Sequence, residues 1–272
     1  MSPASHRAIW RRLDPPASHQ DRKRALGVVE ALVPSFRSQG AQAVVLGGSW
    51  ARGDAHRESD IDLWVLGRRS GSEVRWREPF YVAISRTTEG AARRRLRTPP
   101  YVGGSVPGWR VAIPIYDPRG IARRLQAEAR AFRWGRISKA CDRWVAEQIV
   151  GWAEEAVKLV RALATGQEAT AAVQRNLLSD HLGFVMAIHR RLFWDSENEF
   201  WERIGRRVGG AWARAQRRAL GVPDTPLERG CRAALSLYGL TARAVWNVLS
   251  PEQRTIVANR CRVTGVPLPE DP

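Results

Sequence analysis

The sequence predicts an α+β protein, with a small mixed β-sheet and flanking helices in its first half and an all-α helical bundle after it. Two observations support this division. Short β-branched runs bounded by glycine and polar residues, the pattern of strands, occur only before about residue 135. Beyond that point apolar residues recur at helical spacing. We therefore expect two domains, over residues 1–135 and 136–272.

The first half is expected to alternate between helices and strands. Helices are expected over residues 1–13 and 21–33, and Pro34 should end or kink the second one. Strands are expected over four segments: AVVLGG (43–48), SDIDLWVLG (59–67), EPFYVAISRTT (78–88) and GWRVAIPIYD (108–117). Pro114 favours an edge position for the last strand, because proline donates no ladder hydrogen bond.

Helix signals complete this half. The segment TTEGAARRRLR, residues 87–97, should form a helix capped by Thr87 or Thr88. Asp117 and Pro118 should supply the N-cap and first position of a helix that runs to Ala131. The second half predicts helices over 137–164, 168–193, 197–220 and 226–248, and a last one from near Pro251, separated by glycine, proline and serine breaks.

The composition is strongly basic. The formal net charge is +17, and 41 of the 44 basic residues are arginine, since Lys23, Lys139 and Lys158 are the only lysines. A positive field attracts nucleic acids and phosphates. GC-rich coding also produces such an arginine excess without any selection for binding, so nucleic acid is a less favoured partner. The excess is +12 over residues 1–135, and it therefore centres on the first half.

Cysteine usage and hydropathy indicate the compartment. Cys141, Cys231 and Cys261 are far apart and lack the close pairs of a zinc site, so we expect reduced core residues. No apolar run reaches membrane-spanning length, and residues 1–16 lack the apolar stretch of a secretory signal. We expect a cytoplasmic protein with no membrane partner.

The segment GGSWARGDAHRESDIDLWVLG, residues 47–67, holds the residues with the most chemical content. Strand alternation places Asp60 and Asp62 on one face, and Ile61 and Leu63 on the other. Two carboxylates about 6–7 Å apart along a strand repel each other. Mg²⁺ prefers carboxylate and phosphate oxygens and would remove this repulsion. The pattern predicts a metal site at Asp60 and Asp62.

The residues before this pair predict a phosphate-binding turn. Gly47 and Gly48 allow a sharp turn and a close approach to a ligand. Ser49, expected at the start of a short helix, offers a hydroxyl and an amide where the helix dipole is positive. Arg52 would add a charge-assisted contact.

In this order and at this spacing, the motifs resemble the signature of the DNA polymerase beta-type nucleotidyltransferase superfamily. The matching residues are Gly48-Ser49, Ala51-Arg52-Gly53 and Ser59-Asp60-Ile61-Asp62. The α/β arrangement out to about residue 131 agrees more loosely. The helical half is similar, in topology alone, to the substrate-side bundle of small bacterial members that include antibiotic nucleotidyltransferases.

The resemblance implies a reaction. The family transfers a nucleoside monophosphate from a nucleoside triphosphate to a hydroxyl or other acceptor and releases pyrophosphate. It implies that Asp60 and Asp62 are catalytic and bind Mg²⁺, and that Gly47, Gly48, Ser49 and Arg52 bind the triphosphate. We expect ATP as the nucleotide, AMP as the transferred group and a small molecule as the acceptor.

The sequence departs from the family pattern at the third carboxylate, which members usually carry on a following strand. The natural positions are Ala83 and Ser85 in the third expected strand, and Ala112 and Pro114 in the fourth. Either an acid from elsewhere completes the site, or catalysis is weakened and the domain binds nucleotide as a regulatory module. A third hypothesis is transfer to RNA or protein, as toxin-type relatives do.

One acidic, aromatic segment in the second half has two interpretations. HRRLFWDSENEFWERIG, residues 189–205, could line the acceptor site, with a glutamate as general base. In the simpler interpretation Ser196 caps a helix, Glu197 and Glu199 complement its dipole, and the tryptophans pack.

Overall fold

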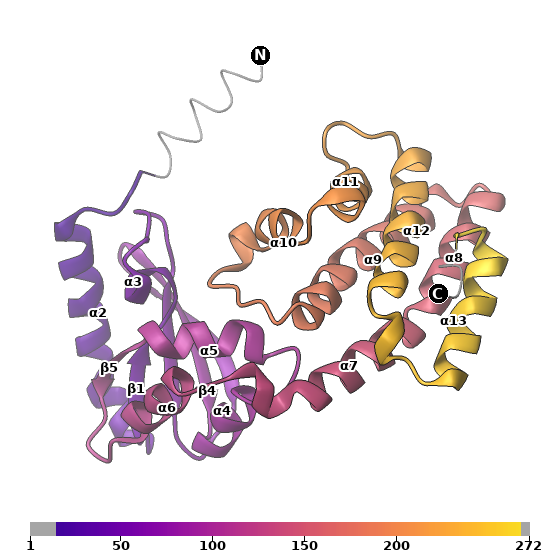
Figure 1. The fold of residues 1–272 in the computed structure, drawn as a ribbon. Coiled ribbons are helices and arrows are strands. Elements are labelled where there is room, and N and C mark those ends of the chain that lie inside the picture. The colour runs from indigo at the N-terminus through magenta and orange to yellow at the C-terminus, as the bar shows by residue number, and fades with distance from the viewer. Residues whose placement is uncertain (1–14, 268–272) are drawn as a thin grey trace, which may run out of the picture. The chain divides into compact units, whose positions relative to one another are not determined.

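The computed structural model describes residues 15–267, so the helix expected over residues 1–13 lies outside the described residues. The fold is α+β, as predicted. The chain divides into two compact units (Figure 1). The first contains the residues up to Arg97 together with Gly104–Phe132, and the second contains Thr98–Gly103 and the residues from Arg133 onward.

The first unit is built on a mixed five-stranded sheet in the order β3-β4-β2-β1-β5. Only β2 and β4 pair in parallel, and the remaining pairs are antiparallel. The strands are β1 (Ala43–Leu46), β2 (Ile61–Leu66), β3 (Gly71–Arg77), β4 (Phe80–Thr87) and β5 (Ile113–Tyr116). The expected edge position of the proline-containing strand is confirmed, because β5 pairs with β1 alone.

Strand β3 was not predicted. Its sequence, GSEVRWR, contains three charged residues, and its side chains are exposed or half-buried because it is the other edge of the sheet. The period-two alternation of Ser72, Val74 and Trp76 with charged residues was the available signal. β3 pairs antiparallel with β4 across a tight connection at Glu78 and Pro79.

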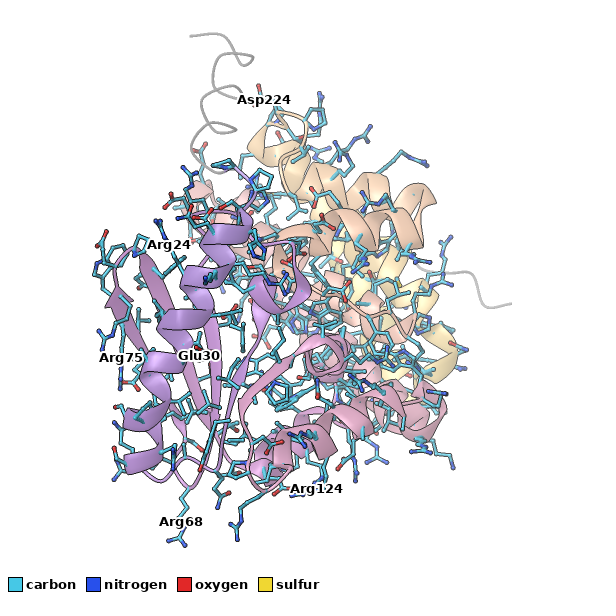
Figure 2. All side chains as sticks on the ribbon, turned by 90° about the vertical axis from the view of Figure 1, so that its left-hand side faces the viewer. Arg24, Glu30, Arg68, Arg75, Arg124 and Asp224 are labelled. Carbon is cyan, nitrogen blue, oxygen red and sulfur yellow. The ribbon has the colours of Figure 1, made fainter. Side chains whose placement is uncertain are left out.

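Among the described residues, five helices accompany this sheet: α2 (His19–Ser38), α3 (Gly48–Arg52), α4 (Glu89–Arg95), α5 (Val102–Val111) and α6 (Ile121–Arg130). Helix α2 does not end at Pro34 and continues for another turn. Proline frees the carbonyl of Glu30, four residues earlier, and Glu30 lies on the exposed side of α2 with Arg24, where water is available (Figure 2).

Two expectations around residues 102–123 were wrong. Residues 108–111 belong to helix α5 and only Ile113–Tyr116 form a strand, because Val106 and Trp109 are buried at helical spacing. Asp117 is not the N-cap of α6, which begins after Gly120 at a φ of 66°. The Asp117 carboxylate instead accepts a hydrogen bond from the backbone N–H of Arg123 at 3.1 Å. Thr88, in contrast, caps α4 as predicted.

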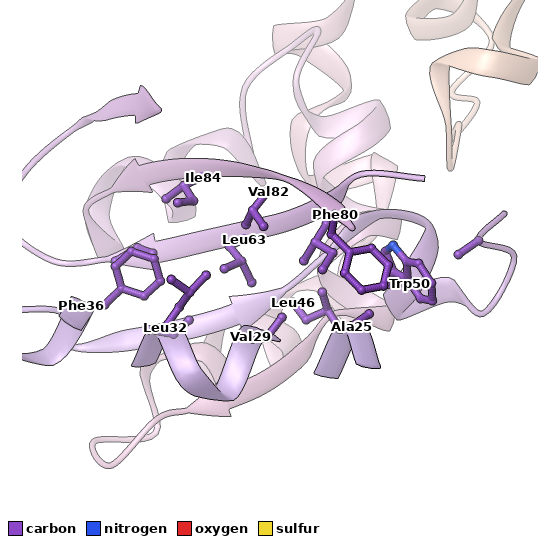
Figure 3. Packing of buried hydrophobic residues seen from close by; sticks show 14 residues of the cluster. Ala25, Val29, Leu32, Phe36, Leu46, Trp50, Leu63, Phe80, Val82 and Ile84 are labelled. Atoms are coloured by element: carbon purple, nitrogen blue, oxygen red, sulfur yellow. The ribbon is translucent and has the colours of Figure 1, made fainter. Parts of the chain in front are cut away.

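The core of the first unit lies between α2 and one face of the sheet. Ala25, Val29, Leu32 and Phe36 of α2 pack against buried strand residues (Figure 3). On β2 and β4 these are Ile61, Leu63, Val65, Phe80, Val82 and Ile84. Because side chains alternate along a strand, the intervening residues of β2 and β4 face the opposite side of the sheet.

The second unit is helical, as predicted. Its helices are α7 (Ser138–Gly151), α8 (Ala153–Ala164), α9 (Glu168–His189), α10 (Phe200–Val208), α11 (Gly210–Ala219), α12 (Leu227–Ala244) and α13 (Pro251–Thr264), with short 3-10 segments at Trp134–Ile137, Glu197–Glu199 and Trp246–Val248. The helix expected over 137–164 is broken at Trp152. The helix expected over 197–220 is broken at Gly209, whose φ of 71° suits glycine.

Buried hydrogen bonds join the helices of this unit. The Tyr238 hydroxyl donates to the Ile149 carbonyl at 2.9 Å, and the Trp212 indole N–H donates to the Thr241 hydroxyl at 2.9 Å. The three cysteines are buried and unpaired, as expected. Within residues 15–267, no helix combines the length and the apolar character needed to cross a bilayer.

Candidate active site

The candidate site begins where β2 begins. Ile61 and Leu63 are fully buried in the core against α2, whereas Asp62 is half-buried on the opposite face of the sheet. Asp60 is exposed and comes directly before the strand. The predicted alternation around Asp62 is therefore confirmed. It holds the Asp62 carboxylate away from the apolar core.

The glycine turn lies against Asp62. Gly48 has a φ of 61°, and a Cβ on it would stand 1.9 Å from Oδ2 of Asp62. A Cβ on Gly47 would stand 2.8 Å from the indole ring of Trp64. The backbone N–H of Gly47 donates to the carbonyl of Asp62 at 2.9 Å. Both glycines are needed because the turn is packed directly onto the side chains of β2.

Backbone donors gather at this turn. Gly48, Ser49 and Trp50 open helix α3, and no described residue accepts a hydrogen bond from their N–H groups. First-turn N–H groups lack partners inside a helix and can bind an anion. Helix α3 has only five residues. Its dipole therefore contributes less to anion binding than we expected from the sequence. Any phosphate affinity here depends on these N–H groups and the Ser49 hydroxyl.

Among the residues of the site, Asp62 has a clearly shifted pKa. Burial, with a smaller contribution from the charge of Asp60, raises the pKa of Asp62 to about 6, although Arg52 acts in the opposite direction. No described residue donates a hydrogen bond to this carboxylate. A half-buried carboxylate that lacks a donor is available to a cation.

Arg52 lies beside this pair. Its guanidinium is 3.0 Å from the Asp54 carboxylate, and only 19% of its side chain is exposed. The positive charge of Arg52 acts to lower the pKa of Asp62, against the effect of burial. Trp50 holds the loop between α3 and β2, because its indole N–H donates to the Ser59 carbonyl at 3.3 Å.

Comparison with known proteins assigns this arrangement to a family. Residues 29–119 match the family described as nucleotidyltransferase domain. This part of the chain is a nucleotidyltransferase domain. The match confirms the resemblance first seen in residues 48–62, and it covers the second half of α2, the sheet and the glycine turn.

Comparisons with curated proteins and with solved structures do not strengthen this assignment. No curated protein matches the chain. Among solved structures, a nucleotidyltransferase-like protein from Exiguobacterium sibiricum 255-15 shares 11% sequence identity, with a TM-score of 0.47 over 86% of this chain and 74% of that one. The assignment of the domain depends on the family match.

The nucleotidyltransferase domain lacks a carboxylate where the register would place one. Ala83 of β4 is the partner of Asp62, and Ser85 is the partner of Trp64. The predicted candidate positions on this strand thus do lie beside β2 on the face of Asp62. Pro114 lies two strands away from β2 and pairs with Val45 of β1, and Ala112 precedes β5. Neither position is therefore beside Asp62.

The acids that flank these strands have other partners. Glu78 accepts the Trp76 indole N–H at 2.9 Å, Glu89 is paired with Arg93 at 2.8 Å, and Asp117 binds the start of α6. Within residues 15–267, no group of three or more histidine, cysteine or acidic side chains forms a metal cluster. Two carboxylates still match the donor set of Mg²⁺, which completes its shell with substrate phosphates and water.

The acidic segment over residues 189–205 follows its structural interpretation. Ser196 accepts a hydrogen bond from the N–H of Asn198 and caps a 3-10 turn. Trp194 is buried and packs edge-to-face on Phe184 and Phe200. Asp195 forms an ion pair with Arg203 at 2.5 Å. These contacts explain the segment as part of the core and surface of the helical unit.

Proposed function

We propose that the protein is a metal-dependent nucleotidyltransferase that moves AMP from ATP to a hydroxyl of a small molecule. The supporting observation is the juxtaposition of the Asp62 carboxylate with the Gly48 turn. A carboxylate without donors lies against Gly48, and no described residue accepts a hydrogen bond from the three N–H groups of the turn that begins there. The two features are complementary to a metal-bound triphosphate, which brings both a cation and anionic oxygens.

The proposed roles follow from this complementarity. The Gly47–Gly48 turn, the N–H groups that follow it and the Ser49 hydroxyl would bind phosphate oxygens, with Arg52 adding positive charge. Asp60 and Asp62 would hold Mg²⁺, which when bound stabilises charge on the attacking and leaving oxygens. The acceptor oxygen bonds to the α-phosphorus, the bond from that phosphorus to the bridging oxygen breaks, and pyrophosphate leaves. The hydroxyl proton passes to a carboxylate or to water.

Nucleotide-dependent thermal stabilisation tests this proposal. ATP, GTP, CTP and UTP are each added with Mg²⁺, and the melting temperature is recorded. At a ligand concentration of 100 times Kd, binding adds about 2.7 kcal/mol, which corresponds to a rise of roughly 5–10 °C. Asp62→Asn should abolish the rise, and omission of Mg²⁺ should reduce it. No stabilisation by any of the four nucleotides would overturn the proposal.

A second candidate is a nucleotide-binding module without turnover, which is favoured by Ala83 at the position that pairs with Asp62. The two candidates differ in transfer of label. The protein is incubated with Mg²⁺, a metabolite extract and nucleoside triphosphates labelled at the α-phosphate. A labelled product that disappears with Asp62→Asn supports the enzyme. Stabilisation by nucleotide without any labelled product supports the module.

A further inference from the structure

An exposed aromatic pair lies on the outer strands of the sheet. Trp76 of β3 is 58% exposed and Tyr81 of β4 is 54% exposed, and the two residues are direct cross-strand partners. Val74, the next residue of β3 on the same face, is 52% exposed. Three large apolar side chains that share one face of a sheet without cover mark a binding surface. We call these three residues the aromatic platform.

The platform is on the same face of the sheet as Asp62. Val82 of β4 is the partner of Ile61 in β2, and both belong to the core against α2. Tyr81, one residue earlier, therefore points to the opposite face and is level with Asp60. Neighbouring strands lie about 4.8 Å apart, so Tyr81 is one strand spacing from the aspartate pair and Trp76 is two.

Carboxylates border the platform on two sides, although the domain as a whole is basic. The Trp76 indole N–H donates to the Glu78 carboxylate at 2.9 Å, and Asp60 and Asp62 border the platform on its other side. The arginines of the hairpin turn away from it. Arg75 and Arg86 each lie 5.3 Å from the centroid of the Phe36 ring, on the α2 face of the sheet.

The order of the strands relates the platform to the reaction. The Gly47–Ser49 turn follows β1, which flanks β2 on one side, and the platform lies on β4 and β3 on the other side. In an in-line displacement the attacking and leaving oxygens are on opposite sides of the phosphorus. If the pyrophosphate leaves over the glycine turn, the acceptor hydroxyl approaches from the platform side.

We propose that the aromatic platform binds the acceptor, which is a small molecule with a planar, conjugated ring that is neutral or cationic. This inference rests on the proposed function for the identity of the acceptor. A planar ring stacks on tryptophan and tyrosine, and a cationic ring substituent gains from the nearby carboxylates and aromatic faces. The phosphates of RNA would meet the Glu78 carboxylate beside Trp76, which disfavours a polyanion on the platform.

Fluorine NMR with 5-fluorotryptophan in the full-length protein tests ring binding directly. The protein is loaded with Mg²⁺ and an ATP analogue with a methylene group between its α- and β-phosphates, and Trp76→Leu identifies the Trp76 resonance. The probe is tyramine, a cationic phenol. Its control is 4-(2-aminoethyl)cyclohexanol, which has the same charge and hydroxyl group but no planar ring. Tyramine should shift the Trp76 resonance in a saturable way, and the control compound should not.

Variants separate stacking from other effects. Tyr81→Leu should weaken tyramine binding about tenfold, the loss expected for one aromatic stacking partner. Tyr101→Leu removes another exposed aromatic ring, one that lies outside the sheet, and should leave the affinity unchanged. The stabilisation by ATP and Mg²⁺ should persist in Tyr81→Leu, because the ring lies on the acceptor side.

Each contrary outcome overturns the inference. One is an equal shift of the Trp76 resonance by tyramine and by its saturated control. Another is a single-stranded oligoribonucleotide that shifts this resonance and binds more tightly than tyramine. The third is a dimer that pairs through β3 and dissociates in Trp76→Leu. Failure of the proposed function is a separate result. In that case no nucleotide stabilises the protein, whether or not tyramine shifts the Trp76 resonance.

Discussion

Asp62 lowers the stability of the fold when its carboxylate is ionised. Its carboxylate is half-buried beside Asp60, and no described side chain or backbone group donates to it. Its pKa of about 6 in the folded protein lies above the ordinary value of 3.8. The folded state therefore retains a proton that the unfolded state has lost between these two pH values. Ionised Asp62 therefore destabilises the fold.

Asp62→Asn should stabilise the ligand-free protein in a manner that depends on pH. The gain in unfolding free energy should be near zero below pH 4, grow between pH 4 and 6, and reach on the order of 2–3 kcal/mol above pH 6. Urea denaturation across this pH range measures it. Asp224→Asn, an exposed carboxylate in the helical unit, is the control and should show no such trend. A loss of stability in Asp62→Asn at pH 8 would contradict this account.

Gly48 is restricted by both its backbone and its neighbour. Gly48→Ala should lower the unfolding free energy more than Gly40→Ala. Both glycines have positive φ, at 61° and 84°, so both substitutions cost about 1–2 kcal/mol of backbone strain. Only the Gly48 substitution also displaces Asp62, because nothing lies within 4 Å of a Cβ on Gly40.

The two glycine variants are compared by urea denaturation and by stabilisation with ATP and Mg²⁺. Gly48→Ala should lose the nucleotide effect, and Gly40→Ala should keep it. Equal nucleotide responses would show that the contact between Gly48 and Asp62 has no part in binding.

At the scale of secondary structure elements, the pairing of β2 with β4 decides what the site contains. β4 is the parallel neighbour that presents side chains beside Asp62, and its residues on that face are Tyr81, Ala83 and Ser85. The position level with Asp62 therefore carries a methyl group. The same strand carries the exposed ring of Tyr81, one residue before the pair formed by Val82 and Ile61. β4 thus places no acidic side chain beside Asp62 and exposes an aromatic ring on the same face of the sheet.

Ala83→Asp tests the importance of the missing carboxylate. We expect the rate of label transfer to rise by at least about tenfold, in line with the effect of one electrostatic group at a reaction centre. Without Mg²⁺ the variant should be less stable than the parent, because a third carboxylate adds repulsion. Ser85→Asp, one pair further along the same face and beside Trp64, is the control. Equal rates in both variants would mean that an acid at the Ala83 position contributes nothing.

At the scale of the whole molecule, the two compact units are stabilised by different interactions. The first has an apolar core between α2 and the sheet, and the second depends on helix packing with buried hydrogen bonds such as that between Trp212 and Thr241. The division into a catalytic domain and an acceptor domain, with a boundary near residue 135, remains a prediction. If the two domains are independent, each compact unit should unfold in a separate transition.

Scanning calorimetry tests this division. We expect two transitions, of which ATP with Mg²⁺ raises only that of the nucleotidyltransferase domain. Thr241→Val leaves the Trp212 N–H buried without a partner, which costs about 1–3 kcal/mol and should lower only the other transition by several degrees. A single transition that shifts as a whole under both changes would contradict the division.

The sequence predicted much of the fold and the candidate site, for a local reason. Alternation along SDIDLWVLG separated Ile61 and Leu63 from Asp62, and the glycine pair marked a turn, because both patterns express the geometry of consecutive residues. The resemblance to the family came from the same short segment, and the match over residues 29–119 confirmed it. Strand β3 was missed although its alternation was a local signal, because three of its seven residues are charged. Helix α5 was partly taken for a strand because its last apolar residues run directly into those of β5.

The sequence alone determined the motif, the fold class and the order of most elements, since these depend on local backbone preferences and hydrophobic periodicity. Only the tertiary structure decided that β4 runs beside β2, that Ala83 is level with Asp62, and that Gly48 touches the Asp62 carboxylate. It also brought Trp76 and Tyr81 to the face of the aspartates. The physical reason is strand register, which is set by long-range hydrogen bonding and core packing between segments that do not adjoin in the chain.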